Sequence, residues 1–339
     1  MANVRSYARL ELELEAGLVL AVGPNGAGKT NLLESLHVGT QGFSPRTRSD
    51  GELIRFGEHA ARIRLEGVRG ATATQIAITL STSEGKRAEL DGARLRAAEQ
   101  LRSETTTLVF TPDRLAIVKG GPAARRAYFD RALARALPSR SALPTDYTAA
   151  LTQRNAGLKR GDQGALAPWT AQVVALGRSL VEARTEIVAL LSEPFRAAAG
   201  LLGLDRTGLD YEGEAPTVEA LEDRLERDLD RGSTGLGPHL HDVAIAAAGR
   251  DLRAFGSQGE QRTAVLALLL AEAGLLEERR EETPLLLLDD VLSELDPERR
   301  RALVEQVRGR GQTLITATTP DALPGEPAQL VHVTPGEAR

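Results

Sequence analysis

The segment GPNGAGKT, residues 23–30, constrains the fold more than any other part of the sequence. It matches the pattern G-x-x-x-x-G-K-[S/T], whose glycines let backbone N–H groups turn inward around a triphosphate. The apolar run Leu18–Val22 comes before it, and a helical stretch from about Lys29 to His37 follows. This is the strand, loop and helix order that the pattern requires. The sequence therefore predicts an α/β fold that binds ATP or GTP at this loop.

Each position of the loop has an expected role in holding the nucleotide and Mg²⁺. Lys29 is expected to reach the β- and γ-phosphates, and Thr30 to ligate Mg²⁺. The helix that begins here adds partial positive charge at its N-terminus. The residues expected to contact the nucleotide are Gly23, Pro24, Asn25, Gly26, Ala27, Gly28, Lys29 and Thr30.

The segment LLLLDDVLSELD, residues 285–296, provides an acidic partner for the loop. Four leucines that end in paired carboxylates are typical of a buried strand whose C-terminal end delivers charge to the edge of the sheet. We expect Asp289 to hold Mg²⁺ through water, and Asp290 to orient or deprotonate the attacking water. Asp296, followed by Pro297, is predicted to be the N-cap of the next helix.

The segment SQGEQRTAVLALLLAEAG begins at Ser257 and allows two interpretations. Ser257 and Glu260 have the spacing of a capping box ahead of an apolar helix, so the turn is explained as an ordinary helix start. The same turn can also be a helix N-terminus that receives a phosphate held by another molecule. The local residues alone do not decide between the two.

The rest of the first third of the chain reads as β structure. Leucine alternates with glutamate over residues 10–15, which predicts a strand directly ahead of the buried strand 18–22. Three alternating segments within residues 61–95, the last with the turn signal Asp91-Gly92, predict an antiparallel sheet. A short buried strand is expected within residues 106–112.

From about Arg125 to Leu202, alanine, leucine and arginine recur at helical spacing. Proline and glycine interrupt this region too often for sustained heptads, so we expect three or four helices and no long coiled coil. Further expected elements are a helix with a solvated face at 217–232, a loop at 232–242, and strands near 243–248 and 312–318. We divide the chain into 1–120, the N-terminal part of an ATPase lobe, 121–245, a helical lobe, and 246–339, which completes the head.

Composition excludes several classes of protein. The chain of 339 residues has no cysteine, so disulfide scaffolds, thiolate metal sites and thiol nucleophiles are excluded. Its start has no signal-peptide pattern and no window is apolar enough for a transmembrane helix, so we expect a cytoplasmic protein without a membrane partner. The net charge of −5 requires any binding of DNA to use local basic patches. Candidate phosphate contacts are Arg125, Arg126, Lys159 and Arg160.

The order of phosphate loop, Ser-Gln-Gly-Glu-Gln turn, acidic strand and SELD resembles that of the ABC-type ATPases. The resemblance implies an ABC-type head with an antiparallel β segment and an inserted helical subdomain. It also implies that two copies close head to tail. Ser257 and Gly259 of one copy would then cover the γ-phosphate held by the phosphate loop of the other, so that Ser257 joins Lys29, Asp289 and Asp290 as a catalytic residue.

Longer strings resemble the RecF family of bacterial recombination mediators from about Val4 to about Thr319. They include GPNGAGKTNLLESL, TPDRLAIVKGGPAARRAYFDRAL, GPHLHD and FGSQGEQRTAVLALLLAEA, although GPHLHD replaces the usual GPHRDD. The resemblance implies an ATP-dependent homodimer on DNA and slow, DNA-stimulated hydrolysis of ATP with Mg²⁺. It also implies cooperation with RecR and RecO in loading RecA at single-strand gaps.

Two alternatives share the phosphate loop. One is the ATPase subunit of an ABC transporter, which predicts a transporter-type signature and a histidine after the last core strand, where this chain has Thr318. The other is a single-site kinase for a small molecule, which predicts a phosphoacceptor pocket and no Ser-Gln-Gly turn.

Overall fold

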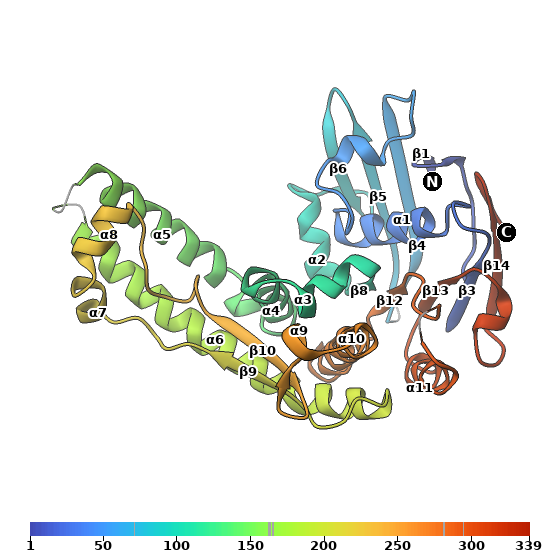
Figure 1. Cartoon of the computed structure of the whole chain (residues 1–339). Coiled ribbons are helices and arrows are strands. Elements are labelled where there is room, and N and C mark those ends of the chain that lie inside the picture. The colour runs from blue at the N-terminus through green and yellow to red at the C-terminus, as the bar shows by residue number, and fades with distance from the viewer. Residues whose placement is uncertain (71, 162–163, 165, 281, 294) are drawn as a thin grey trace. The chain divides into compact units, whose positions relative to one another are not determined.

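The computed structural model describes residues 1–70, 72–161, 164, 166–280, 282–293 and 295–339. The chain divides into two compact units (Figure 1). The first unit comprises residues 1–114, 201–203 and 276–339, and the second comprises residues 115–200 and 204–275.

A mostly parallel six-stranded sheet forms the centre of the first unit, in the order β15-β14-β3-β13-β12-β8. Its strands are β3 (Leu18–Val22), β8 (Thr107–Phe110), β12 (Leu285–Leu288), β13 (Thr313–Ala317), β14 (Gln329–Thr334) and β15 (Glu337–Ala338). β14 and β15 pair in antiparallel fashion, whereas the other described pairs of this sheet are parallel. The parallel strands β3, β8, β12 and β13 are almost wholly buried, as their uninterrupted apolar and small residues predict. Because β3, β12 and β13 run parallel, the segments that follow them meet at one edge of the sheet.

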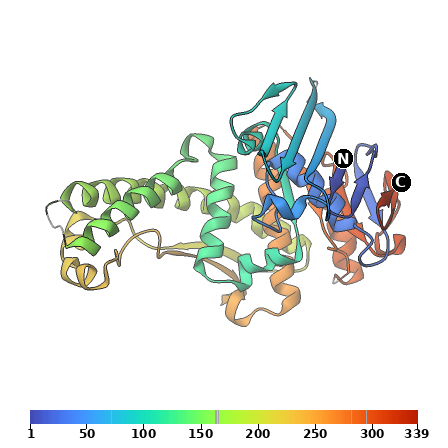
Figure 2. The ribbon, with the colours of Figure 1, turned by 90° about the horizontal axis from the view of Figure 1, so that it is seen from above.

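An antiparallel sheet in the order β2-β1-β4-β5-β6-β7 completes the first unit. Its strands are β1 (Ala2–Val4), β2 (Tyr7–Arg9), β4 (Ala60–Arg69), β5 (Thr72–Ser81), β6 (Gly85–Leu90) and β7 (Ala93–Arg94), and Figures 1 and 2 show β4, β5 and β6 side by side. The predicted turn is confirmed, with φ values of 50° at Asp91 and 81° at Gly92. One face packs on helix α1 (Lys29–Gln41), where Val38, Ile63 and Ile78 share a core.

Shorter elements surround these sheets. They are the helices α2 (Leu101–Glu104) and α11 (Pro297–Val307), with 3-10 turns at Asp50–Leu53, Ala98–Gln100, Pro112–Leu115 and Pro320–Ala322. Asp296 caps α11 as predicted, because its side chain accepts hydrogen bonds from the N–H groups of Glu298 and Arg299. The carboxylate therefore satisfies N–H groups that the first turn of a helix leaves without partners.

The second unit is mainly helical. Its helices are α3 (Ala116–Lys119), α4 (Pro122–Ala136), α5 (Leu143–Arg160), α6 (Leu166–Leu201), α7 (Val218–Glu222), α8 (Leu225–Arg231), α9 (Leu252–Phe255) and α10 (Gln258–Arg280), with a 3-10 turn at Pro138–Arg140. The last residue of α6 and residues 276–280 of α10 are grouped with the first unit. A small sheet in the order β11-β10-β9 joins β9 (Thr207–Glu212), β10 (Asp242–Ala247) and β11 (Arg250–Asp251). The expected helices within residues 125–202 are confirmed as α4, α5 and α6.

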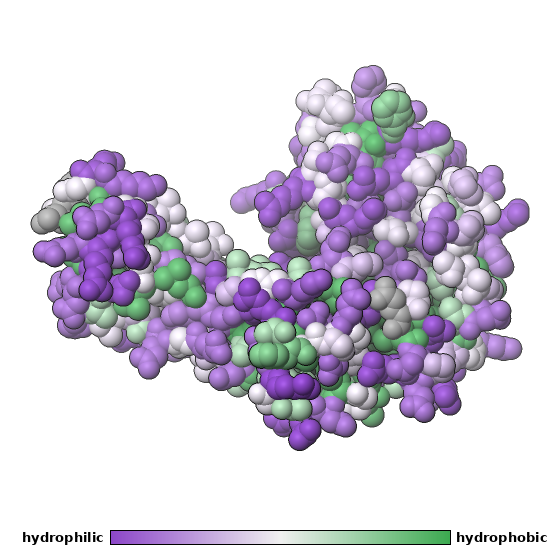
Figure 3. Space-filling view, viewed as in Figure 1, coloured by the Kyte–Doolittle hydropathy of each residue, from purple (hydrophilic) through white to green (hydrophobic). Residues whose placement is uncertain are grey.

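The acidic segment 217–232 forms two short helices where one was expected, since residues 223–224 form a turn between α7 and α8. Hydrophilic side chains cover the surface over these helices (Figure 3), in agreement with the expected solvated face. Within the described ranges, no helix is both long enough and apolar enough to cross a membrane.

The strand predicted over residues 10–15 is wrong. These residues form no strand, because the side chains of Gln312 and Gln329 take the backbone hydrogen bonds that a neighbouring strand would have made. Gln329 Oε1 accepts from the Glu15 N–H at 3.0 Å, and Gln312 Nε2 donates to the Glu15 carbonyl at 2.8 Å. The alternation of leucine and glutamate reflects Leu12 and Leu14, which pack against the core from an irregular segment.

The division of the chain by contacts differs from our three segments. Residues 246–275 group with the helical unit because α10 packs against α4. The Tyr128 hydroxyl donates to the Leu268 carbonyl at 3.2 Å, and Arg135 Nε donates to Glu272 Oε1 at 2.6 Å. Both bonds join residues more than 130 positions apart in the sequence. The functional roles assigned to the three segments stay predictions.

Candidate nucleotide-binding site

The phosphate loop connects the end of β3 to the start of α1 at the edge of the parallel sheet. Gly26 and Gly28 have φ values of 81° and 112°, a region that side chains other than glycine rarely adopt. Gly23 is also required, because a Cβ there would lie 2.1 Å from the carbonyl oxygen of Val333. Gly28 is the N-cap of α1 and provides no side-chain hydrogen bond to it. The first N–H groups of the helix are therefore left for an anion.

Lys29 is held over the loop by backbone carbonyls. Its Nζ donates to the carbonyl oxygens of Gly23 at 2.6 Å and Pro24 at 3.0 Å, and the residue is 9% exposed. Burial lowers the pKa of the Lys29 ammonium, and the nearby Asp290 and Asp289 carboxylates oppose this shift. Both of these acceptors are neutral, so the charge of the ammonium is left for an anionic ligand.

Thr30, Asp289 and Thr316 form a connected polar chain across the sheet edge. The Thr30 hydroxyl lies 3.1 and 3.0 Å from the two carboxylate oxygens of Asp289, and Thr316 Oγ1 donates to Asp289 Oδ1 at 2.7 Å. Asp289 is 5% exposed, and this burial raises the pKa of its carboxyl, whereas the two hydroxyl hydrogen bonds lower it. A hydroxyl and a carboxylate are hard oxygen ligands of the kind that Mg²⁺ prefers, so the residues present fit this ion.

Asp290 follows at the end of the same strand segment in a left-handed conformation, with φ of 49°. Its backbone N–H donates to Thr316 Oγ1 at 2.9 Å, and its carbonyl accepts from Ser293 Oγ at 3.1 Å. These bonds hold the backbone while the side chain stays partly exposed. Thr316 thus orients both aspartates, one through the side chain and one through the backbone.

Two residues of this site were missed by sequence reasoning. Thr316 was counted only as part of a strand, although a threonine inside a buried strand is a signal that its hydroxyl has a partner. Tyr7 is fully buried, its hydroxyl donates to the Gly28 carbonyl at 3.1 Å, and burial raises its pKa to about 12. Tyr7 therefore supports the phosphate loop as a neutral hydrogen-bond donor to its backbone.

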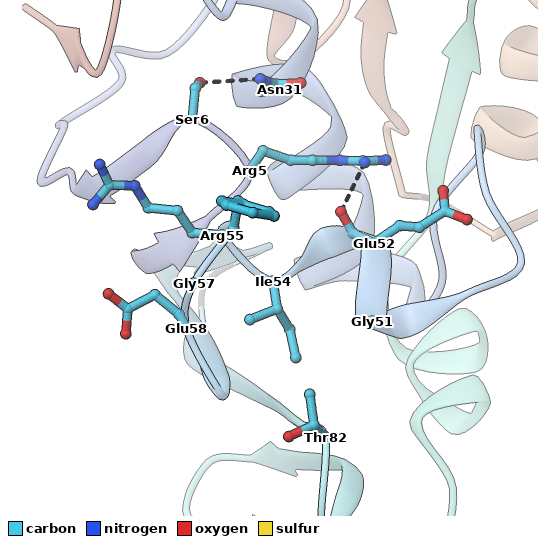
Figure 4. Close-up of a pocket in the computed structure, with 11 residues that line it drawn as sticks. Arg5, Ser6, Asn31, Gly51, Glu52, Ile54, Arg55, Gly57, Glu58 and Thr82 are labelled. Carbon is cyan, nitrogen blue, oxygen red and sulfur yellow. Dashed lines mark hydrogen bonds between the residues drawn. The ribbon is translucent and has the colours of Figure 1, made fainter.

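A pocket of about 630 Å³ lies beside the start of α1 (Figure 4). Residues that line it include Arg5, Ser6, Asn31, Ile54, Phe56 and Thr82. Asn31 directly follows Thr30, and its amide donates to Ser6 Oγ at 3.0 Å. The pocket therefore adjoins the phosphate loop within the first unit.

The capping box at the start of α10 is confirmed in the second unit. The Ser257 N–H donates to Glu260 Oε2 at 2.7 Å, and the Glu260 N–H donates to Ser257 Oγ at 3.2 Å. Ser257 is exposed and Gly259 partly exposed. The cap is therefore a real structural element, and its serine lies at the surface.

The four candidate DNA contacts differ in their exposure to solvent and in their internal hydrogen bonds. Arg125 is 3% exposed and its guanidinium binds Asp242 through Nε and Nη2, at 2.7 and 2.5 Å, so it has an internal role. Arg126 is partly buried and donates to the His241 carbonyl at 2.5 Å. Lys159 and Arg160 are exposed in the last turn of α5.

The internal bonds of Arg125 and Arg126 explain part of the segment GGPAARRAYFD. Both arginines hold the loop at residues 237–242, and Asp130 holds it through Arg184, which also donates to the Pro238 carbonyl at 2.6 Å. The charges of this segment therefore fix a loop that lies more than a hundred residues further along the chain.

The whole chain is similar to known proteins in sequence. A family model described as the RecF/RecN/SMC N terminal domain matches residues 1–338. A DNA replication and repair protein RecF from Heliobacterium modesticaldum is 34% identical over 337 residues, which cover 94% of this chain and 91% of the relative. The chain belongs to the RecF family. A second RecF, from Kineococcus radiotolerans, is 34% identical over 383 residues and covers 100% of this chain and 97% of the relative.

Solved structures agree with the RecF assignment. The structure of the recombination mediator protein RecF-ATP in the RecFOR pathway has a TM-score of 0.88 and 28% identity, and covers 100% of this chain and 95% of that chain. The Smc head bound to the C-winged helix domain of ScpA has a TM-score of 0.61 and 14% identity over 99% of this chain and 94% of that chain, and so shares the fold. The predicted head fold is confirmed, and RecF membership replaces the transporter and kinase alternatives.

Proposed function

We propose that the chain is an ATP-dependent DNA-binding clamp of recombinational repair, which dimerises head to tail around two ATP molecules on DNA. The observation that carries the proposal is the bond between Thr30 of the phosphate loop and the buried carboxylate of Asp289. It joins segments 259 residues apart, which supports a site where the phosphate loop and the acidic strand act on one nucleotide. The similarity to a RecF-ATP structure supports ATP as the nucleotide.

Within one copy, each site residue has a part that its present contacts support. The Lys29 ammonium exchanges the carbonyls of Gly23 and Pro24 for the β- and γ-phosphates, a stronger charged pair. Thr30 and Asp289 would hold Mg²⁺, which when bound neutralises charge on the phosphates. Asp290 orients the attacking water, and Thr316 keeps both aspartates in place. The pocket beside Asn31 provides room for the nucleoside end.

Ser257 and Gly259 act on the nucleotide of the other copy. The helix N-terminus after Ser257 carries partial positive charge, and the hydroxyl is at the surface, where a second copy reaches it. ATP then joins two chains, since one copy binds its phosphates and the other covers the γ-phosphate. Slow hydrolysis, stimulated by DNA, removes this shared group and lets the dimer separate.

The partners follow from the family. The related structures are described as belonging to the RecFOR pathway, which supports RecR and RecO as partners of this chain in loading RecA at single-strand gaps. Lys159 and Arg160 are proposed phosphate contacts because they are exposed, whereas Arg125 is internal and Arg126 is partly so.

Sedimentation tests the nucleotide, the dimer and the DNA together. The chain is measured without nucleotide, with ATP and Mg²⁺, and with a non-hydrolysable ATP analogue, each with and without gapped DNA. We expect single chains without nucleotide and dimers with the analogue, which gapped DNA stabilises. Single chains at saturating analogue and Mg²⁺, with DNA present, would overturn the proposal.

A further inference from the structure

The antiparallel sheet of the first unit carries a row of arginines across its strands. Arg9 is opposite Ala2, Ala2 is opposite Arg62, Arg62 is opposite Thr79, and Thr79 is opposite Arg87. Directly opposed residues project from the same face of a sheet. We call Arg9, Arg62 and Arg87 the arginine row. A small side chain separates each arginine from the next.

This row lies on the face turned away from α1. Ile63 and Ile78 are opposite each other and point into the core that they share with Val38 of α1. Successive residues of a strand point to opposite faces, so Arg62 points the other way, and it is exposed. Arg9 and Arg87 are also exposed. The arginine row therefore faces solvent across five neighbouring strands, β2, β1, β4, β5 and β6.

The spacing of the row suits a nucleic-acid backbone. Successive arginines are two strands apart, so the row spans four strand spacings, or roughly 19 Å. Duplex DNA rises about 3.4 Å per base pair, and the row therefore extends along about half a helical turn. Each backbone turns away from a facing surface within half a turn, so three guanidinium groups along such a length would contact phosphates of both strands across a groove.

The acidic neighbours of the row do not block it. Arg9 pairs with Glu11 and Arg87 with Glu84, and all four side chains are at least 44% exposed. Exposed ion pairs contribute little because water screens them, so a phosphate displaces the glutamate at small cost. Arg62, at the centre, has no ion pair recorded among the described residues. The row itself contains no acid, although the whole chain has a net charge of −5.

A second row on the same face is of mixed charge. Arg64 is opposite Ala77, Ala77 opposite Glu89, and Glu89 opposite Arg94. It adds a net positive charge of one. Arg64 also pairs at 2.9 Å with the exposed Glu66, two residues further along β4 on the same face. This part of the face is therefore neutral, and the positive charge belongs to the first row.

We propose that the arginine row binds the phosphate backbone of duplex DNA, without reading sequence and without needing nucleotide. The five row positions offer arginine, alanine and threonine, and no aromatic ring on which unpaired bases stack, which favours a duplex over a single strand. Nucleotide is not needed because a single unit of a single chain carries all three arginines. The proposal rests on the proposed function in taking DNA as the ligand.

The test compares the wild type with R62A/R87A, and with R301A/R339A as the control. The control removes two exposed arginines from the same unit and leaves the row intact. Binding to a short labelled DNA duplex is measured by fluorescence anisotropy without nucleotide, over a series of KCl concentrations. We expect R62A/R87A to bind at least about tenfold more weakly, with a salt slope shallower by about 2, because each phosphate contact contributes roughly 0.9. The control should match the wild type.

The outcomes separate this inference from the proposed function. R62A/R87A with the affinity and salt slope of the control would overturn the arginine row, and would leave the ATP-dependent clamp intact if sedimentation still gives dimers on DNA. The same measurement on a single strand of equal length tests the choice of duplex. If R62A/R87A lost affinity for the single strand alone, the assignment to duplex DNA would be overturned. Thermal unfolding and ATP binding by R62A/R87A should equal those of the wild type, since the substituted side chains are exposed and outside the phosphate loop.

Discussion

Single residues at the sheet edge are already in place for a triphosphate. Lys29 is buried among carbonyls, Asp289 is buried with two hydroxyl partners, and burial disfavours the charged form of each. The folded protein therefore carries an unfavourable free energy of burying these charges, which the binding of phosphates and Mg²⁺ offsets. The site is thus organised before its ligand binds.

Replacing Lys29 removes the one side-chain cation that the phosphate loop provides. We expect Lys29→Met to weaken ATP binding by roughly 10- to 100-fold, the effect of losing a charged hydrogen bond. Its thermal stability should be unchanged or slightly higher, because a buried ammonium is removed. Calorimetric titration with ATP checks the affinity. Wild-type affinity in Lys29→Met would contradict the assignment of this loop.

Asp290 is suited to a conservative test. Its φ is 49°, a conformation that asparagine adopts readily, so Asp290→Asn keeps the backbone while it removes the negative charge. We expect hydrolysis to slow by about 100-fold or more, the contribution of a positioned base, with ATP binding retained. Phosphate release at saturating ATP measures the rate. Sedimentation should find longer-lived dimers, and an unchanged hydrolysis rate would remove Asp290 from this role.

At the scale of elements, α10 combines a structural cap with an exposed position. Ser257 and Glu260 satisfy each other's backbone N–H groups, so loss of either weakens the cap by up to about 1 kcal/mol. Of these two residues, Ser257 alone is also proposed to contact the nucleotide of a second copy. The two residues therefore form a matched pair of variants.

We expect Ser257→Arg to leave ATP binding by single chains intact and to prevent ATP-dependent dimers, because its long side chain occupies the place of the γ-phosphate. Glu260→Ala should lose a similar part of the cap and still dimerise. Sedimentation with the non-hydrolysable analogue measures both variants. Dimers of Ser257→Arg at the wild-type concentration dependence would contradict contact between copies.

Elements with a strong local pattern were predictable from the sequence. The phosphate loop, the antiparallel strands within residues 61–95 and the Asp296 cap each follow from residues that are close in sequence. The strand at 10–15 was wrong and β9 was missed, because their pairing depends on residues far away: Gln312 and Gln329 in one case, and β10 in the other. For the same reason, the support that Thr316 and Tyr7 give to the site was not found.

For the whole molecule, two histidines of the helical unit make stability depend on pH. His239 bonds to the Tyr147 hydroxyl and to the Thr234 carbonyl, and His241 bonds to the Tyr211 hydroxyl. Burial lowers the pKa of both imidazoles, and the nearby Arg184 and Arg126 lower it further. Both are therefore neutral in the folded protein at neutral pH.

The direction of this pH dependence is set by proton uptake in the unfolded chain. Below the ordinary histidine pKa of about 6.5, the unfolded chain binds protons that the folded chain does not, so the free energy of unfolding falls as pH falls. We expect a decline from pH 6.5 downward that is smaller in the double variant His239→Gln, His241→Gln. Urea unfolding followed by circular dichroism at several pH values measures it. Equal declines in both proteins would contradict the prediction.

The order of strands in the parallel sheet has a consequence for synthesis on the ribosome. β3 leaves the exit tunnel long before its two neighbours, β13 and β14, which lie within residues 313–334. A nascent chain must keep the apolar Leu18–Val22 from aggregating while hundreds of later residues, including the entire helical unit, are translated. The sheet that carries the phosphate loop is therefore complete only after residue 334 has been translated, so shorter nascent chains do not compete for ATP.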